Sequence, residues 1–538
     1  MPDISANCAG IKSPNPFWLA SAPPTNTGAQ IMRAFDAGWG GAVWKTLGQP
    51  VQNVSSRFGG LHLRGTRAIG FNNIELITDR PLETNFKEIY EVKKRYPHNA
   101  VIVSLMVETE AEWQDIIKRS IDAGADGLEL NFGCPHGMCE RGMGSAVGQE
   151  PTVNERITSW AVKYSSVPVL VKLTPNVSDI VPHGLAAQRG GAHGVSLINT
   201  IKSIIGVDID RLVPEPRVAG QATNGGYCGS AVKPIALHMV ASLARDYHFN
   251  LPISGIGGIA NWRDAVEFMV LGASSVQVCT EVMLRGYRIV QDMIDGLEGY
   301  MRDKGLETLA PLIGAAVPRY SEWGDLNINY ETVARIDADR CIGCHLCVVA
   351  CQDGAHQCIH PDAEGKSFVP VVDESECVGC NLCQIVCPVP DCITMAEVDN
   401  GFAPATWNEH VHLGASIRPK KGAHCSGADP PSGPQRPVRG AKRAHRRRRP
   451  GTSRSPGRLV FTGARSRRVT ADAGGGPRAP AWCNARTRGD PSRPRSRGPR
   501  GRGCLPRGPV DRGSVKGAGA GDYSVAWRLP WVVMGSPS

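Results

Sequence analysis

The sequence predicts an α/β protein in which a (β/α)8 barrel is followed by a small α+β domain and by a disordered tail. Three observations support this prediction. Eight β-rich runs alternate with helical segments in the first 300 residues, two cysteine runs repeat between residues 335 and 400, and the final stretch is dominated by Arg, Pro and Gly. A chain of 538 residues is also too long for a single domain.

The barrel prediction comes from eight apolar runs that are typical of strands buried on both faces. They lie at residues 17–22, 41–46, 101–106, 127–132, 168–173, 194–199, 251–256 and 275–280. Amphipathic segments separate most of them, for example AEWQDIIKRSIDAGA at 111–125. Eight such units over residues 1–300 fit a (β/α)8 barrel. A doubly wound sheet is the alternative, but no early G-x-G-x-x-G supports it.

The strand ends predict where the chemistry lies, because barrel active sites form at the C-terminal ends of the strands. Polar residues or glycines recur there: Ser21, Lys45, Thr46, Asn131, Lys172, Asn199, Thr200, Gly257, Gly258, Cys279 and Thr280. Any one of them could simply terminate its strand, but together they indicate one polar mouth. The loops after the last two strands also suit the usual barrel phosphate site.

Residues 301–334 are expected to be a connector, and residues 335–400 a ferredoxin-like domain. CIGCHLCVVAC and CVGCNLCQIVCP share the spacing C-x2-C-x2-C-x3-C and start 36 residues apart. This is the pattern of two-cluster bacterial ferredoxins, in which the fourth Cys of each run binds the other cluster. One 4Fe–4S cluster is therefore expected on Cys341, Cys344, Cys347 and Cys387, and the other on Cys377, Cys380, Cys383 and Cys351. Zinc sites, the alternative, would not require this spacing.

The charge distribution separates the body of the chain from its tail. The whole chain has a net charge of +10, but residues 411–538 hold 28 Lys and Arg against five Asp and no Glu, a net charge of +23. The first 410 residues have a net charge of −13. Residues 413–538 are therefore expected to be disordered. They would be a nucleic-acid-binding extension or, as we favour, an out-of-frame translation.

Signals for export and membrane insertion are missing from the sequence. The N-terminus MPDISANCAG lacks the basic and apolar regions of a secretory signal, and no apolar run is long enough for a membrane span. Eighteen cysteines in such a chain indicate metal or redox work in a reducing compartment. The cytoplasm is the expected location.

A flavin in the barrel would connect one-electron clusters to two-electron organic chemistry. Lys45 and Lys172, at the ends of two strands, could place positive charge beside the flavin and stabilise its reduced form.

Four motifs resemble the pyrimidine-reducing half of the dihydropyrimidine dehydrogenase family. They are NFGCPHGMCERGMG (131–144), VKLTPNVSDIV (171–181), NTIKSIIGVDID (199–210) and GGYCGSAVKPIAL (225–237). The order of barrel and ferredoxin domain is also the same, and the likeness is strongest to the bacterial form, where this half is a separate subunit. The wider relatives are the dihydroorotate dehydrogenases.

The resemblance implies that FMN binds in the barrel and that uracil or thymine is interconverted with its 5,6-dihydro form. It implies FMN contacts from Ser21, Lys45, Thr46, Lys172, Gly229, Ile256, Gly257, Gly258, Cys279 and Thr280. It implies pyrimidine contacts from Asn73, Asn131, Asn199 and Thr200. Asn72 is the second candidate for the role given to Asn73. Amide side chains carry both donors and acceptors, so they suit the alternating N–H and C=O groups of a neutral base.

Cys134 is the expected proton donor. In the implied reaction hydride reaches C6 of the base from N5 of the flavin, and C5 must then receive a proton; an ordinary thiol is mostly protonated at neutral pH. His136 is a weaker candidate for the same role. The glycine-rich remainder of the motif suits a lid, in which Cys139, where the family usually has Gly, has no assigned function.

The resemblance further implies a partner, because the body has no convincing NAD(P) fingerprint. The partner would be a flavoprotein subunit that binds FAD and NAD(P)H, in a heterotetramer of two plus two subunits. Dihydroorotate dehydrogenase activity is the alternative within the same enzyme class.

Overall fold

The computed structural model describes residues 1–62, 68–135, 142–363, 365 and 367–419. Only residues 413–419 of the expected tail fall within this range, so the interpretations of the tail concern residues outside it. No helix in the described ranges is long and apolar enough to cross a membrane.

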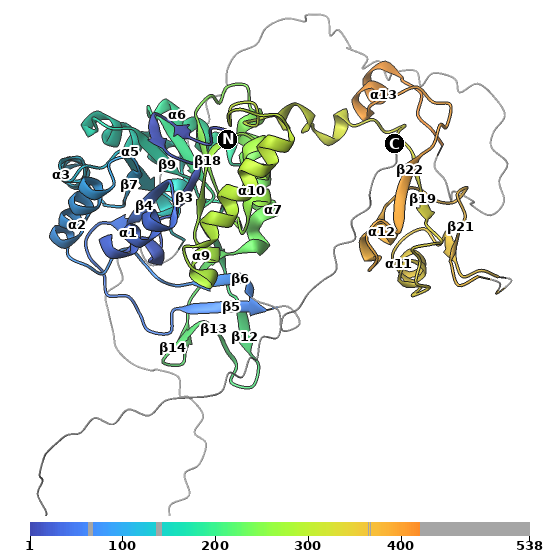
Figure 1. Cartoon of the computed structure of the whole chain (residues 1–538), viewed down its shortest axis with the longest axis horizontal. Helices are drawn as coiled ribbons and strands as arrows, with labels where there is room; N and C mark the ends of the chain where they lie inside the picture. The colour runs from blue at the N-terminus through green and yellow to red at the C-terminus, as the bar shows by residue number, and fades with distance from the viewer. Residues whose placement is uncertain (63–67, 136–141, 364, 366, 420–538) are drawn as a thin grey trace, which may run out of the picture. The chain divides into compact units, whose positions relative to one another are not determined.

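Eight parallel strands close into a barrel in the order in which they occur in the chain (Figure 1). They are β3 (Phe17–Leu19), β4 (Gly41–Leu47), β7 (Ala100–Leu105), β8 (Gly127–Asn131), β9 (Val169–Lys172), β10 (Gly194–Leu197), β17 (Ile253–Ile256) and β18 (Ala273–Val278). Each overlaps one of the eight predicted runs, so the barrel prediction is confirmed.

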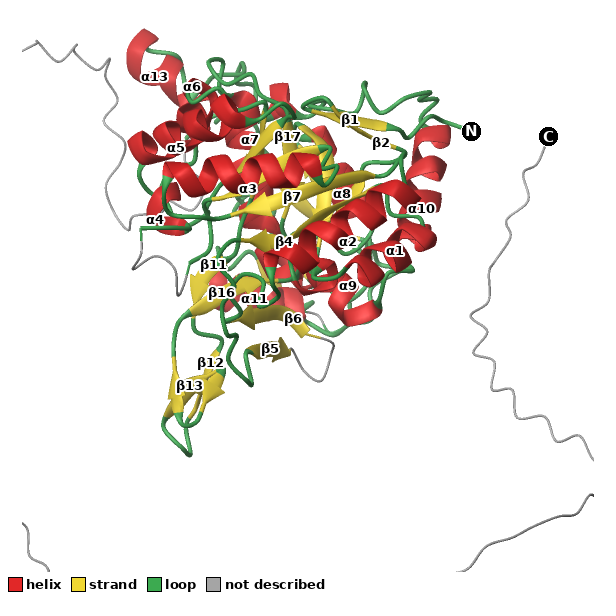
Figure 2. Ribbon diagram, turned by 90° about the vertical axis from the view of Figure 1, so that its left-hand side faces the viewer, coloured by secondary structure: helices red, strands yellow, loops and turns green. Residues whose placement is uncertain are grey.

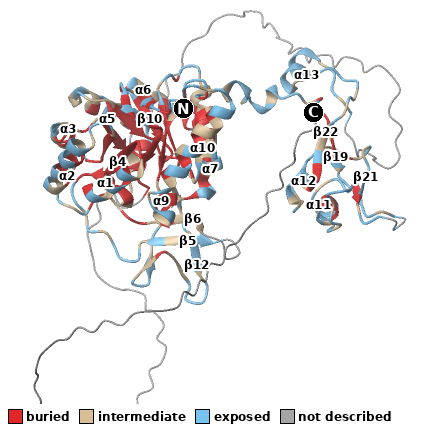
Figure 3. Ribbon diagram, viewed as in Figure 1, coloured by how far each residue is buried: buried red, intermediate tan, exposed pale blue. Residues whose placement is uncertain are grey.

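Helices surround the barrel on its outer side (Figure 2). The main ones are α1 (Gly28–Ala37), α2 (Leu82–Arg95), α3 (Glu110–Asp122), α5 (Pro151–Tyr164), α6 (Val181–Arg189), α7 (Lys233–Arg245), α8 (Trp262–Val270) and α10 (Ile289–Asp303), with the short α4 (Ser145–Gly148) and α9 (Thr280–Arg285). Local chemistry starts several of them: Thr109 and Glu112 form a capping box at α3, and Asn261 and Asp264 form one at α8. The buried faces of these helices and the strands form one core (Figure 3).

A hairpin of β1 (Ala6–Cys8) and β2 (Ile11–Ser13) closes the N-terminal end of the barrel. Its apolar side chains pack with inward-facing barrel residues in a cluster that we call the floor: Cys8, Ile11, Trp18, Val43, Ala100, Ile102 and Leu170. Glycines make room for the large members. A Cβ on Gly127 would lie 2.4 Å from Ile11 Cδ1, and one on Gly41 would lie 2.7 Å from Trp18 Cδ1.

A four-stranded antiparallel sheet lies at the opposite, C-terminal end of the barrel. It has the order β11-β16-β6-β5, with β5 (Phe58–His62) and β6 (Ala68–Asn73) from the loop after β4, and β11 (Ile201–Ser203) and β16 (Gly225–Cys228) from the loop after β10. The short strands β12 (Gly206–Asp208), β13 (Val213–Glu215), β14 (Arg217–Val218) and β15 (Gln221–Ala222) extend the second loop. Two long βα loops thus build a cover that the sequence did not predict.

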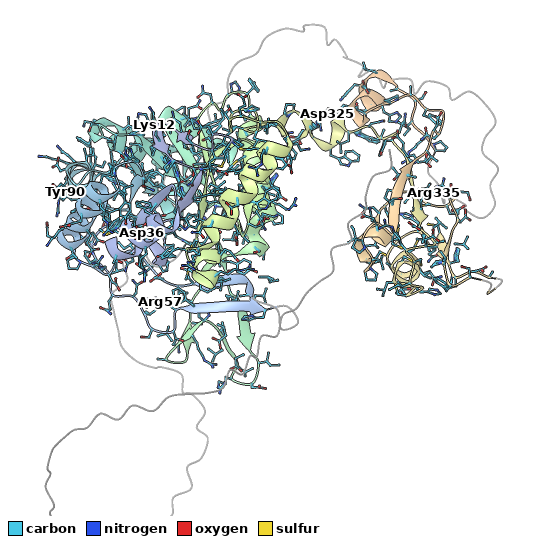
Figure 4. The ribbon with its side chains drawn as sticks, in the orientation of Figure 1. Lys12, Asp36, Arg57, Tyr90, Asp325 and Arg335 are labelled. Carbon is cyan, nitrogen blue, oxygen red and sulfur yellow. The ribbon has the colours of Figure 1, made fainter. Side chains whose placement is uncertain are left out.

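The cysteine-rich domain contains an antiparallel pair, β19 (Thr332–Ile336) and β22 (Ile393–Glu397). Each cysteine run continues into a helix that begins within it, α11 (Leu346–Gly354) and α12 (Leu382–Val386), and β20 (Ile359–His360) pairs with β21 (Val371–Val372). Arg335, labelled in Figure 4, forms an ion pair with Glu374 at the surface. Six cysteines belong to the buried core of this domain, together with Val333, Ala334, Val348, Ile359 and Ile393.

The connector (301–334) contacts the barrel with its first part and leads into the cysteine-rich domain with its last. Its first part packs on the barrel, where the backbone N–H groups of Gly314 and Ala316 donate to the carbonyls of Met269 and Val270. It contains the 3-10 turns η4 (Val317–Arg319) and η5 (Trp323–Asp325); two others, η1 (Pro23–Thr25) and η3 (Ser230–Val232), lie in barrel loops. After α13 (Trp407–Leu413), Arg418 pairs with Glu331 at 3.0 Å.

A candidate active site at the barrel mouth

One large cavity lies between the C-terminal strand ends and the covering sheet. The space free of protein atoms is about 1230 Å³, counted with its open mouth, which is ample for two small molecules side by side. All fifteen residues that the sequence placed in the barrel site line it: Ser21, Lys45, Thr46, Asn73, Asn131, Cys134, Lys172, Asn199, Thr200, Gly229, Ile256, Gly257, Gly258, Cys279 and Thr280. The fold therefore gathers the candidates, and their individual roles remain predictions.

A chain of hydrogen bonds fixes the polar side chains across this mouth. Ser21 Oγ lies 3.2 Å from Thr46 Oγ1, which accepts from Asn131 Nδ2 at 3.0 Å. Asn131 Oδ1 accepts from Asn199 Nδ2 at 2.9 Å, and Asn199 Oδ1 accepts from the Thr200 N–H at 2.8 Å. Each amide is oriented by its neighbour, so the site presents a defined set of donors and acceptors before any ligand binds.

The adjacent residues Asn72 and Asn73 of β6 have different surroundings. Asn72 is fully buried, and its Nδ2 donates to Ser203 Oγ at 2.8 Å. Asn73 lines the cavity, and its Nδ2 donates to the Gly226 carbonyl at 3.3 Å. Alternation along the strand explains the difference, and it supports the sequence's preference for Asn73 as the ligand-facing residue.

Lys45 shares a carboxylate with an arginine. Its Nζ lies 2.9 Å from Glu75 Oε1, and both side chains are about 95 % buried. Arg57, labelled in Figure 4, approaches the same oxygen to 3.2 Å. Glu75 lines the cavity but was missed from the sequence. Its position two residues after Asn73 in FNNIEL was the signal that could have identified it.

Lys172 has a second carboxylate partner, inside the barrel. Its Nζ lies 3.5 Å from Oε1 of Glu129, which is fully buried. Glu129 and the cavity-lining Gln277 were also missed. Glu129 faces inward, because side chains repeat every two residues along a strand and Asn131, two positions later, faces the mouth. Gln277 also faces inward, because its Nε2 donates to Glu129 Oε2.

Glycine backbone shapes the end of the cavity where the sequence predicts flavin phosphate. Gly229, Gly257 and Gly258 all have positive φ, at 95°, 134° and 75°. A Cβ on Gly258 would lie 2.9 Å from the Gly229 carbonyl oxygen, so a side chain would fill the space that backbone now lines. In addition, the buried Oε1 of Gln277 has no hydrogen-bond partner among the described residues. The glycine-lined backbone and the Gln277 acceptor fit a flavin.

Cys134 lies at the edge of the same cavity. It is 9 % exposed and packs in a small cluster with Ile77, Met106 and Met143. The N–H of Ser145 donates to its carbonyl at 3.0 Å, which fixes the backbone after the motif. His136, Cys139 and all of the expected lid (136–144) except residues 142–144 lie outside the described residues, so these expectations stay predictions.

Two further thiols, those of Cys228 and Cys279, line the cavity. Burial raises the pKa of Cys228 to about 11, although Thr280 Oγ1 donates to its sulfur at 3.2 Å. Burial also raises the pKa of Cys279, with the neighbouring Cys228 adding to the effect. Both thiols are therefore protonated and uncharged at neutral pH, which suits contact with an aromatic ring system rather than nucleophilic work.

The cysteine-rich domain contains two smaller cavities, and the crossed pairing predicted for the clusters matches them. One is lined by Cys341, Cys344, Cys347 and Cys387, and the other by Cys351, Cys377, Cys380 and Cys383. Each contains three closely spaced cysteines of one run and the fourth of the other, as two cubane clusters require. Cys392 and Cys358 are additional buried cysteines at these cavities.

Comparison with known proteins agrees with both domains. A family model described as dihydroorotate dehydrogenase matches residues 3–301, and one described as a 4Fe-4S dicluster domain matches residues 334–395. The second match supports iron–sulfur clusters over zinc sites.

Three relatives show where the chain falls within the family. The NAD-dependent dihydropyrimidine dehydrogenase subunit PreA of Escherichia coli K12 is 43 % identical over 357 residues, 66 % of this chain and 87 % of the relative. The chloroplastic dihydropyrimidine dehydrogenase (NADP(+)) of Arabidopsis thaliana is 40 % identical over 338 residues, 60 % of this chain and 79 % of the relative. The catalytic subunit of dihydroorotate dehydrogenase B (NAD(+)) of Pyrococcus horikoshii is 35 % identical over 315 residues, 57 % and 96 % of the two chains. The chain therefore belongs to the dihydroorotate dehydrogenase family and is an oxidoreductase of the dihydropyrimidine dehydrogenase type.

Proposed function

We propose that this chain reversibly reduces uracil or thymine to the 5,6-dihydro base. Electrons pass from a partner subunit that oxidises NAD(P)H, through two 4Fe–4S clusters, to FMN in the barrel. The observation that carries the proposal is the cavity itself, in which a hydrogen-bonded series of amide side chains and one buried cysteine face a glycine-lined cradle.

The amide series suits a neutral pyrimidine. Asn131 and Asn199 are already oriented by one another and by Thr46, while Asn73 and Thr200 line the same cavity. We assign these four cavity-lining side chains to the base, whose ring N–H and C=O groups would pair with them. An analogue that left them unpaired would be rejected, because unsatisfied buried polar groups are costly.

The charges of the cavity distinguish this proposal from dihydroorotate dehydrogenase activity. Orotate carries a carboxylate, which an unpaired cation in the cavity would bind most strongly. Lys45 and Lys172 are the basic residues among the described cavity lining, and each already faces a carboxylate, Glu75 or Glu129. A neutral base needs no such cation, so we favour uracil and thymine over orotate.

Cys134 is assigned the proton that C5 receives, and its thiolate would remove that proton in the reverse direction. A bound FMN would supply hydride at C6 and accept electrons from the clusters. Ser21, Lys45, Thr46, Lys172, Gly229, Ile256, Gly257, Gly258, Cys279 and Thr280 would hold it. The apolar neighbours Ile77, Met106 and Met143 would exclude water from the thiol.

The partner is assigned from electron supply. The relatives named above are described as NAD-dependent or NADP-dependent, and one of them is named as a subunit. We propose that a separate flavoprotein subunit with FAD oxidises NAD(P)H and passes electrons to the clusters on Cys341, Cys344, Cys347 and Cys387 and on Cys351, Cys377, Cys380 and Cys383, in a heterotetramer.

The test is to purify the chain anaerobically, measure its flavin and iron, and assay uracil, thymine and orotate with reduced methyl viologen as the electron donor. We expect one FMN, two clusters, and reduction of uracil or thymine well above that of orotate. A preference for orotate would establish the alternative activity, and a protein without flavin would refute the proposal.

A further inference from the structure

The interior of the barrel changes character between its floor and its mouth. Above the apolar floor, inward-facing positions hold Glu129, Ser196, Ser254, Ser275 and Gln277, which are all at most 1 % exposed. Barrel interiors are usually filled by branched apolar residues. A fully buried carboxylate in this layer therefore needs a physical explanation.

The two carboxylate oxygens of Glu129 have different surroundings: one accepts hydrogen bonds, and the other faces a lysine. Its Oε2 accepts from Ser196 Oγ at 2.8 Å and from Gln277 Nε2 at 2.9 Å. Its Oε1 has no hydrogen-bond partner among the described residues and faces Lys172 Nζ at 3.5 Å. The strand register supports this arrangement, because Lys172 pairs with Ser196 on the next strand. The carboxylate is thus fixed directly behind the lysine that lines the cavity.

Stability alone does not account for this pair. Removing two charges from water costs more free energy than their attraction reliably returns, and apolar residues of similar volume are often as stable or more so. The pair is also different from Lys45 and Glu75. Glu75 lines the cavity, where a ligand can contact it, whereas Glu129 lies behind the cavity wall and acts only through its neighbours.

We infer that Glu129 is a positioning residue and fixed counter-charge for Lys172, and that it limits how strongly this lysine favours the reduced flavin. The inference rests on the proposed function, because it requires a flavin against Lys172. A positive charge beside the ring stabilises the anionic reduced form, and a negative charge behind it offsets that effect. The neutral pair would keep the flavin potential low enough for the bound flavin to reduce a pyrimidine.

The test is a series of variants that changes only the charge of the pair. Glu129→Gln leaves an isosteric side chain and a net charge of +1, Lys172→Met leaves −1, and the double variant returns to zero. We expect the flavin midpoint potential to be highest in Glu129→Gln, lowest in Lys172→Met, and close to the unmodified protein in the double variant. If Lys172→Met does not fold, because it leaves a buried carboxylate unpaired, the other three proteins still carry the comparison.

Two controls show whether a change in the flavin midpoint potential comes from the charge of the pair. Ser196→Ala removes a hydrogen bond from Glu129 but no charge, so its flavin potential should stay near that of the unmodified protein. The clusters, followed by electron paramagnetic resonance in the same titrations, should keep their potentials because they belong to another domain. A Glu129→Gln potential equal to or below the unmodified value would overturn the inference. If that protein nevertheless binds FMN and reduces uracil, only the inference fails; if the unmodified protein binds no flavin, the proposed function fails.

Discussion

The floor and the mouth of the barrel share several strands, with the β1–β2 hairpin added at the floor, but their side chains differ in chemistry. At the floor, Ile11, Trp18 and Leu170 pack as a dry apolar cluster, with exposures of 1 % or less. At the mouth, Lys45 and Lys172 lie two residues beyond the floor residues Val43 and Leu170, and they are almost as buried but carry charge. Burial therefore does not distinguish these two layers, and the side-chain chemistry does.

The difference indicates that the two layers contribute differently to the stability of the fold. Apolar burial stabilises the fold by ~25 cal/mol for each Å² removed from water, whereas buried charges and amides stabilise it little. We therefore expect substitutions at the floor to lower stability with little effect on catalysis, and substitutions at the mouth to do the reverse. Three predictions test this contrast.

The largest effect is expected at Cys134 in the mouth. Replacement by Ala removes the proposed proton donor, and general acid catalysis of this kind contributes about 10²–10⁴-fold in rate. Uracil reduction should therefore fall by at least about 100-fold, while flavin content and thermal stability stay nearly unchanged. Steady-state kinetics together with the flavin absorbance spectrum provide the measurement.

The matched control is Cys134→Ser, which keeps the shape of the side chain but replaces the thiol by a much weaker acid. It should be nearly as slow as the alanine variant. Normal turnover in either variant would show that another group supplies the proton. The expectation that substitutions at the mouth mainly affect catalysis would then lack support from Cys134.

A comparably large effect, but on stability, is expected at Trp18 in the floor. Trp18 is fully buried, and its Nε1 donates to Ser13 Oγ at 2.9 Å. Replacement by Ala should lower the free energy of unfolding of the barrel by about 3–5 kcal/mol. At a temperature where the variant is folded, its kcat should match that of the unmodified protein. A loss of kcat in the folded variant would show that the floor also shapes the site.

The sequence predicted the barrel well because its strongest signal is local. Each strand is a short apolar run, and residues such as Asn131 and Lys172 mark its polar end. The cluster ligands were equally accessible, since the spacing of Cys341, Cys344 and Cys347 is itself the chemical requirement for binding a cubane.

The covering sheet and the inner polar layer could not be predicted in the same way. Strands β6 and β16 pair across more than 150 residues of sequence, and nothing local in FNNIEL indicates that partner. Glu129 sits inside an apolar run, LELN, where a single charged residue looks like an exposed position. Its partners Ser196 and Gln277 come from strands that only the closed barrel brings together.

The smallest effect is expected at Asn72 and Asn73. In these neighbouring residues, one substitution should affect catalysis and the other should affect stability. Asn73→Ala should lower kcat/KM for uracil about 10-fold, which corresponds to about 1.4 kcal/mol of lost transition-state binding, because a substrate hydrogen bond is lost. Its melting temperature should not change. Asn72→Ala should leave kcat/KM nearly unchanged but lower the melting temperature, because Ser203 Oγ loses its partner across the covering sheet. Paired kinetic and thermal measurements distinguish the two. If the effects were exchanged, β6 would present the opposite face to the substrate, and Asn72 would be the residue that contacts the base.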